Sequence, residues 1–198
     1  MKILYDDLYI EMNGSLSDKM TEKAFFNFCA SNDLVRLERD EKGQIYIMPL
    51  IGMIYSNMNV EVCGEIYIWN KKYKKGVSFG SCVGFTLSDN SVRSPGAAWM
   101  KQKTWDAILP EEKEKFARAC PEFIYELKSG SDNLIYLKNK MQKWIENGCE
   151  LAWLIIPEKE EAHIYRNDGS IEIVKGFDKK LSGENVLQGF ELDLSILQ

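Results

Sequence analysis

The segment from residue 123 to residue 156 constrains the fold of this 198-residue chain more than any other. Residues 123–128 predict a buried strand, and the nearly continuous apolar run at residues 151–156 is typical of a central strand. Between them, residues 133–147 predict a helix, because apolar side chains recur at helical spacing: Leu134, Leu137, Met141 and Trp144. A strand, a helix and a strand in this order predict a right-handed parallel crossover.

The other expected elements alternate in type, and most of their strands should pair antiparallel. A long amphipathic helix is predicted over residues 54–69, with Gly76 as its stop. Ser131 or Asp132 should cap the helix of residues 133–147. The remaining expectations are, in chain order, a helix capped by Ser17, a hairpin of residues 34–37 and 45–48, strands at 77–79, 85–87 and 97–100, a helix at 111–119, a hairpin turning at 167–169, and a strand at 190–194.

These elements predict one α/β (α+β) domain over residues 1–198, with a mixed central sheet flanked by helices, because no linker or repeat interrupts the sequence. The five cysteines form no close pair, which favours reduced thiols in the cytoplasm. No apolar run approaches the ~18 residues of a membrane helix. The amino terminus carries two aspartates where a signal peptide needs an apolar core. Neither membrane insertion nor secretion is expected.

Glu126 and Lys128 are the candidate catalytic pair. Successive side chains of a strand point to opposite faces, so these two are expected on the same face. A carboxylate beside an ammonium at this spacing can ligate Mg²⁺ and position a water, while the lysine counters developing negative charge. The alternative is a solvated pair on a strand face, which is common and contributes little to stability.

Two longer stretches surround this pair: SFGSCVGFTLSDNSVRSPGAAWM and CPEFIYELKSGSDNLIYLKNKMQKWIENGCELAWLIIPEKEEAHIYR. They resemble the PD-(D/E)XK nuclease superfamily and, within it, the Uma-two family of restriction endonucleases. The resemblance implies a restriction-endonuclease-like fold and hydrolysis of DNA phosphodiesters with Mg²⁺ or Mn²⁺. It implies that Glu126 is a metal ligand and that Lys128 completes the acidic-x-Lys motif. It also matches Lys140, on the following helix, to a lysine of the family pattern.

One part of the family pattern is missing. The family has R-x-P-D before an A-A-W strand, whereas this chain has Arg93, Ser94, Pro95 and then Gly96, so that glycine stands in place of the metal-binding aspartate. Apolar Met53 and Ile54 stand where the family often has a polar residue. Mg²⁺ sites depend on one or two carboxylates plus waters, so the metal ion should bind weakly, if at all.

Two functions therefore stay open. The first is a Mg²⁺-dependent endonuclease-like protein with a damaged metal site. The second is a catalytically inactive nuclease-fold module that binds nucleic acid or forms a homo-oligomer. The net charge of −5 restricts DNA contact to a local basic groove near Lys128, Lys140 and residues 71–75. A solvated helix terminus is the alternative interpretation of the lysines at residues 71–75.

Overall fold

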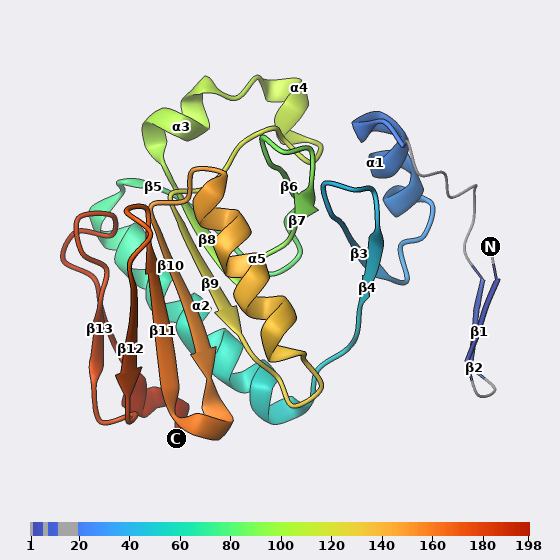
Figure 1. The fold of residues 1–198 in the computed structure, drawn as a ribbon. Helices are drawn as coiled ribbons and strands as arrows, with labels where there is room; N and C mark the ends of the chain where they lie inside the picture. The colour runs from blue at the N-terminus through green and yellow to red at the C-terminus, as the bar shows by residue number, and fades with distance from the viewer. Residues whose placement is uncertain (1, 6–7, 12–19) are drawn as a thin grey trace.

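The computed structural model describes residues 2–5, 8–11 and 20–198. Its centre is a six-stranded sheet in the order β12-β11-β10-β9-β8-β5 (Figure 1). β9 and β10 pair in parallel and the other four pairings of this sheet are antiparallel, which confirms the predicted crossover and mixed sheet. The strands are β5 (Gly76–Phe79), β8 (Ala97–Lys101), β9 (Phe123–Leu127), β10 (Leu151–Ile156), β11 (Glu161–Arg166) and β12 (Ile171–Lys175).

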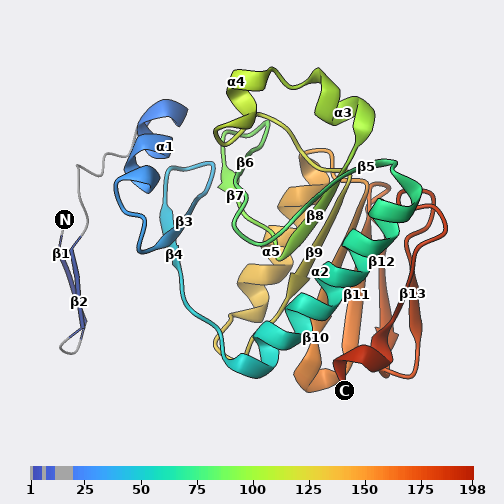
Figure 2. The same ribbon diagram turned by 180° about the vertical axis from the view of Figure 1, so that it is seen from behind.

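Two long helices, α2 (Met53–Tyr73) and α5 (Leu134–Glu146), cover opposite faces of this sheet (Figures 1 and 2). α2 buries Val62, Ile66 and Trp69 against the face that carries Phe123 and Tyr125. α5 buries Leu137, Met141 and Trp144 against the face that carries Ile124. Because side chains alternate along a strand, β9 turns Glu126 toward α5.

A smaller sheet in the order β4-β3-β7-β6 lies beside the central one, with α1 next to it (Figure 1). It contains the predicted hairpin of β3 and β4, and β7 leads through residues 94–96 into β8 of the central sheet. This connection places the β3 hairpin close to β9 and α5. The elements are α1 (Glu22–Ala30), β3 (Arg36–Arg39), β4 (Ile45–Met48), β6 (Phe85–Thr86) and β7 (Val92–Arg93).

The remaining elements lie outside the two larger sheets. They are β1 (Lys2–Tyr5), β2 (Leu8–Glu11), α3 (Gln102–Ala107), α4 (Pro110–Lys113), the 3-10 helices η1 (Pro157–Lys159) and η2 (Leu194–Leu197), β13 (Lys180–Ser182) and β14 (Glu191–Asp193). The predicted cap Ser17 lies outside the described residues, and α1 is capped by Thr21, whose side chain accepts a hydrogen bond from the Ala24 N–H.

Three predicted ends of helices were wrong, and two of them concern α4 and α5. The helix expected at residues 111–119 ends at Lys113, because the following chain pairs with β6 instead: the Thr86 N–H donates to the Ala117 carbonyl at 3.0 Å. The cap of α5 is Asn133, whose side chain accepts from two backbone N–H groups, rather than Ser131 or Asp132.

Gly76 does not stop α2. The helix ends at Tyr73, and its cap Lys74 adopts the left-handed conformation at φ 51° and donates its N–H to the Asn70 carbonyl. Gly76 already belongs to β5, and a Cβ there would lie 2.0 Å from the Met100 carbonyl oxygen. Close packing between β5 and β8 therefore explains this glycine, whereas Gly148 does terminate α5, at φ 109°.

Candidate functional site

A lysine ammonium lies between two carboxylates where the small sheet meets the central one. Lys140 Nζ, from α5, lies 2.6 Å from Glu38 Oε1 of β3 and 2.6 Å from Glu126 Oε1 of β9. The same ammonium donates to the Ser94 carbonyl at 2.8 Å. Three acceptors from three different segments thus converge on one buried cation.

Arg93 and Tyr136 complete this buried cluster. Glu38 Oε2 lies 3.5 Å from Arg93 Nη1 and accepts a hydrogen bond from the Tyr136 hydroxyl at 3.3 Å. The Ser94 N–H donates to Glu38 Oε1 at 3.1 Å. Side-chain exposure is 9% or less for the two carboxylates and the two cations. Two negative and two positive charges are therefore neutralised within the cluster, which burial requires.

Burial and charge shift the protonation of this cluster. Burial raises the pKa of Glu126, Lys140 lowers it, and Glu38 raises it again, so the net pKa lies above the ordinary value. Burial lowers the pKa of Lys140, but the two neighbouring carboxylates raise this pKa by more than burial lowers it. The pKa of Lys140 therefore also lies above its ordinary value. Lys140 consequently stays an ammonium at neutral pH.

We expect Glu126 to give folding a distinct pH dependence. Its raised pKa means that the folded protein holds this proton more tightly than the unfolded chain. Its contribution to the free energy of unfolding must then fall as pH rises from the ordinary value of 4.5 through the folded-state pKa. Urea titrations of wild type and Glu126→Gln across this range should show wild type losing stability relative to the variant. A parallel pH dependence for the two proteins would contradict the shift.

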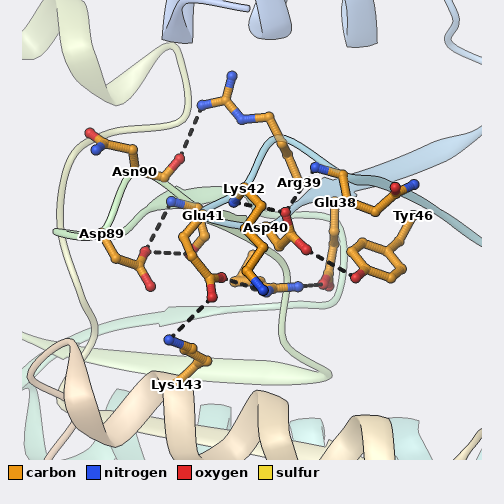
Figure 3. A network of polar contacts seen from close by, with 12 residues as sticks. Glu38, Arg39, Asp40, Glu41, Lys42, Tyr46, Asp89, Asn90 and Lys143 are labelled. Carbon is orange, nitrogen blue, oxygen red and sulfur yellow. Dashed lines mark hydrogen bonds and ion pairs between the residues drawn. The ribbon is translucent and has the colours of Figure 1, made fainter. Parts of the chain in front are cut away.

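The hairpin that carries Glu38 has a second set of ionic contacts. Lys143 of α5 points toward Glu41 (Figure 3), with Nζ 3.4 Å from Oε1. Glu41 Oε2 also lies 3.9 Å from Arg93 Nη2. The Tyr46 hydroxyl donates to Asp40 within the hairpin (Figure 3). The partly exposed Lys143–Glu41 contact holds the hairpin against α5, and the Arg93–Glu41 contact holds it against β7. Both contacts add to the positioning of Glu38.

A cavity of about 460 Å³ opens beside the cluster. Glu38, Glu126 and Gly96 line it, together with Asn59 from α2 and Asp132 from the loop before α5. The rest of the wall is largely apolar and includes Phe26, Val35, Leu37, Met48, Val83 and Phe116. The cavity brings the residue at position 96 and the predicted metal ligand to one wall.

Lys128, the lysine of the predicted motif, pairs with another carboxylate. Its Nζ lies 3.1 Å from Glu158 Oε1 and donates to the Ser129 carbonyl at 2.9 Å. The Tyr55 hydroxyl, from α2, donates to the same Glu158 oxygen. Burial raises the pKa of Glu158, but these two donors lower it more, so Glu158 is a stable counter-ion for Lys128. The structure therefore joins Glu126 to Lys140 and places the Lys128 ammonium with Glu158.

Comparison with known proteins identifies the family. The sequence model of the Uma2 family, described as "Putative restriction endonuclease", matches residues 23–195. The chain belongs to the Uma2 family. The crystal structure of a "putative nuclease" from Anabaena variabilis ATCC 29413 is similar in fold, with a TM-score of 0.70 and 16% identity over 81% of this chain and 88% of that chain. A search of the curated proteins gives no match.

For this Uma2 chain, sequence analysis missed several polar residues of the site, among them Glu38 and Asn59. Glu38 lies in the short strand RLER, where nothing local distinguishes it from a surface residue, although it is fully buried. Asn59 is the polar side chain that α2 presents to the cavity, whereas Met53 and Ile54 are 90% and 70% exposed. Asn59 lies one to two helical turns after Met53 and Ile54, and this position was the signal in the sequence that could have identified it.

The donor set does not fit a resident Mg²⁺ ion. No group of three His, Cys, Asp or Glu side chains arranged to hold a metal occurs within residues 20–198. The nearest carboxylate oxygens of Glu38 and Glu126 already contact Lys140, and position 96 of this Uma2 chain supplies no carboxylate. Mg²⁺ needs near-octahedral oxygen coordination with at least one or two free carboxylates. The Lys140 ammonium thus neutralises the two carboxylates that a divalent cation would need as ligands.

Nothing in the described helices is suited to crossing a bilayer, since none combines the necessary length and apolar character.

Proposed function

We propose that this Uma2 protein is a nuclease-fold DNA-binding protein that does not hydrolyse phosphodiesters through a bound Mg²⁺ ion. One observation carries the proposal: Lys140 Nζ lies 2.6 Å from both Glu38 and Glu126. The fold and the family support an origin as a metal-dependent endonuclease acting on DNA. Fold alone does not establish activity, which depends on the groups present in the site.

The proposed loss of hydrolysis follows from having an ammonium where a nuclease would hold a metal ion. Mg²⁺ in a nuclease neutralises the phosphate and generates a hydroxide nucleophile from bound water. An ammonium can neutralise charge, but it cannot lower the pKa of a ligated water. Lys140 is buried, forms ion pairs with Glu38 and Glu126, and donates a hydrogen bond to the Ser94 carbonyl. Lys128 is paired with Glu158, so neither cation is available to a substrate phosphate without breaking existing contacts.

A cleavage assay tests this proposal. Supercoiled plasmid incubated with the protein and Mg²⁺ or Mn²⁺ should be nicked no faster by wild type than by Glu126→Gln. This variant is the right background control, because it removes the predicted metal ligand while keeping its shape. Nicking by wild type that Glu126→Gln abolishes would overturn the proposal.

That opposite outcome would support the second candidate, a metal-dependent endonuclease. One observation favours it: Glu126, Asn59 and Asp132, whose side chains carry oxygen atoms, line the same cavity. Such an enzyme would have to move Lys140 away from Glu126 before the metal could bind. Its cleavage should then require metal concentrations well above those that saturate ordinary two-carboxylate sites.

We propose further that DNA contact is confined to a small basic surface. Lys140 cannot contact DNA, because only 2% of this residue is exposed. The basic groove expected from the sequence therefore loses this lysine. The exposed lysines at the end of α2, namely Lys71, Lys72, Lys74 and Lys75, are the available phosphate contacts. About four phosphate contacts predict an affinity loss of roughly 100-fold between about 50 and 200 mM salt.

Fluorescence anisotropy with a short duplex over a salt series measures this slope. The double variant Lys74→Gln/Lys75→Gln should bind more weakly and show a shallower salt dependence. Lys138→Gln, which removes an exposed lysine from α5, is the matched control and should leave both quantities unchanged. Binding by wild type that does not vary with salt would exclude a phosphate-contacting surface.

We also propose that residues 1–198 act as one domain in the cytoplasm. All five cysteines are free, which is typical of a reducing compartment.

A further inference from the structure

The outer face of α2 is apolar and uncovered. Val60, Tyr67 and Ile68 are 64%, 56% and 61% exposed. They lie on the side of the helix opposite Val62, Ile66 and Trp69, which face the sheet. Figure 2 shows α2 in front of the sheet with no element of the fold in front of it. An exposed apolar stripe of this kind on a folded domain marks an interaction surface.

Gly64 lies in the middle of this stripe. A Cβ at this position would meet no atom within 4 Å, so packing within the chain does not require a glycine here. Glycine in the interior of a helix costs about 1 kcal/mol relative to alanine. A small residue at the centre of an exposed helix face instead allows the backbone of a second helix to approach closely.

The charges on and beside this stripe are polarised along the helix. Glu61 and Glu65 are exposed in the middle of α2, and Lys71 and Lys72 are exposed in its last turn. No ion pair within residues 20–198 involves Glu61, Glu65 or Lys71. An acidic segment followed by a basic one is complementary to its own copy when the two helices run antiparallel.

We infer that the outer face of α2 binds a second copy of this chain, forming a two-fold symmetric dimer through antiparallel helices. In a two-fold interface, if residue i contacts residue j, then j also contacts i. An axis midway between Gly64 and Ile68 sets Gly64 against Ile68 of the partner subunit, and sets Glu61 against Lys71 of the partner subunit. Each pairing occurs twice. This inference goes beyond the proposed function and does not depend on the state of the Lys140 cluster. In the dimer Lys71 pairs with a carboxylate, so Lys72, Lys74 and Lys75 remain for contact with phosphate.

Analytical ultracentrifugation over a concentration series tests the dimer. Wild type should show a reversible monomer–dimer equilibrium. Ile68→Glu should raise the dissociation constant by roughly 30-fold, as for loss of an interface hot spot. Ile135→Glu changes an isoleucine of α5 that is 73% exposed, and it should leave the equilibrium unchanged. A wild type that stays monomeric at all concentrations, or equal effects of the two substitutions, would overturn the inference.

Charge exchange separates this arrangement from any other apolar association. Glu61→Lys alone and Lys71→Glu alone should each weaken self-association, because like charges then face each other. An equimolar mixture of the two variants should form heterodimers more strongly than either variant forms homodimers, since one of the two salt bridges is restored with reversed sign and the other is kept. Mixing that gives no gain would exclude the antiparallel register, and circular dichroism of each variant checks that α2 remains folded.

Discussion

Replacing Lys140 by methionine is expected to lower the free energy of unfolding by about 3–5 kcal/mol, the typical loss when one partner of a buried ion cluster is removed. The substitution leaves Glu38 and Glu126 buried and facing each other, with Arg93 as the remaining cation near Glu38. Methionine keeps the length of the side chain, so the effect reports lost charge rather than an empty cavity. Urea unfolding followed by circular dichroism measures it.

The matched control for this experiment is Lys138→Met. Lys138 lies on the same helix but is exposed, so its replacement should change stability by less than about 0.5 kcal/mol. The effect of Lys140→Met should also shrink at low pH, because protonation of Glu126 removes one of the two uncompensated charges. Comparable stability of the two variants at neutral pH would show that the cluster contributes nothing to folding.

The second large effect concerns metal binding. The double variant Gly96→Asp/Lys140→Gln is expected to bind Mn²⁺ at least ~100-fold more tightly than wild type, because ligand charge count sets the affinity of such oxygen sites. It combines a new carboxylate at position 96 with two carboxylates released from the ammonium. Gly96→Asp alone should gain little, since Lys140 still neutralises Glu38 and Glu126.

Isothermal titration calorimetry with Mn²⁺ on wild type, both single variants and the double variant measures this gain. A Cβ at position 96 would lie 3.0 Å from the Tyr125 carbonyl oxygen and 3.2 Å from Asn59 Oδ1, so a shift of a few tenths of an ångström is required there. Thermal melts with and without Mn²⁺ report binding independently, because a ligand at 100 times its Kd stabilises the folded state by about 2.7 kcal/mol. Tight Mn²⁺ binding by wild type would mean that Lys140 does not block the site.

The secondary structure of the central sheet and its two covering helices could be predicted from the sequence because it depends on local periodicity. Leu137, Met141 and Trp144 recur at helical spacing and do pack on the sheet, and the apolar run of β10 is its fully buried central strand. The right-handed crossover rule then placed β9 and β10 in parallel without further information. Two of the boundaries that failed, at Lys113 and Asn133, depend on contacts with β6 and on a single cap side chain.

The partners of the charged residues were decided by the tertiary structure alone. Glu126 was identified from its motif, but its ammonium partner is Lys140 rather than Lys128, and the second carboxylate, Glu38, lies 102 positions away from Lys140 in the chain. Periodicity reports which face of an element a side chain occupies, and it carries no information about which distant segment packs on that face. The interaction energy of a buried charge depends on the charges next to it. The chemistry of this site is therefore defined only when β3, β9 and α5 come together.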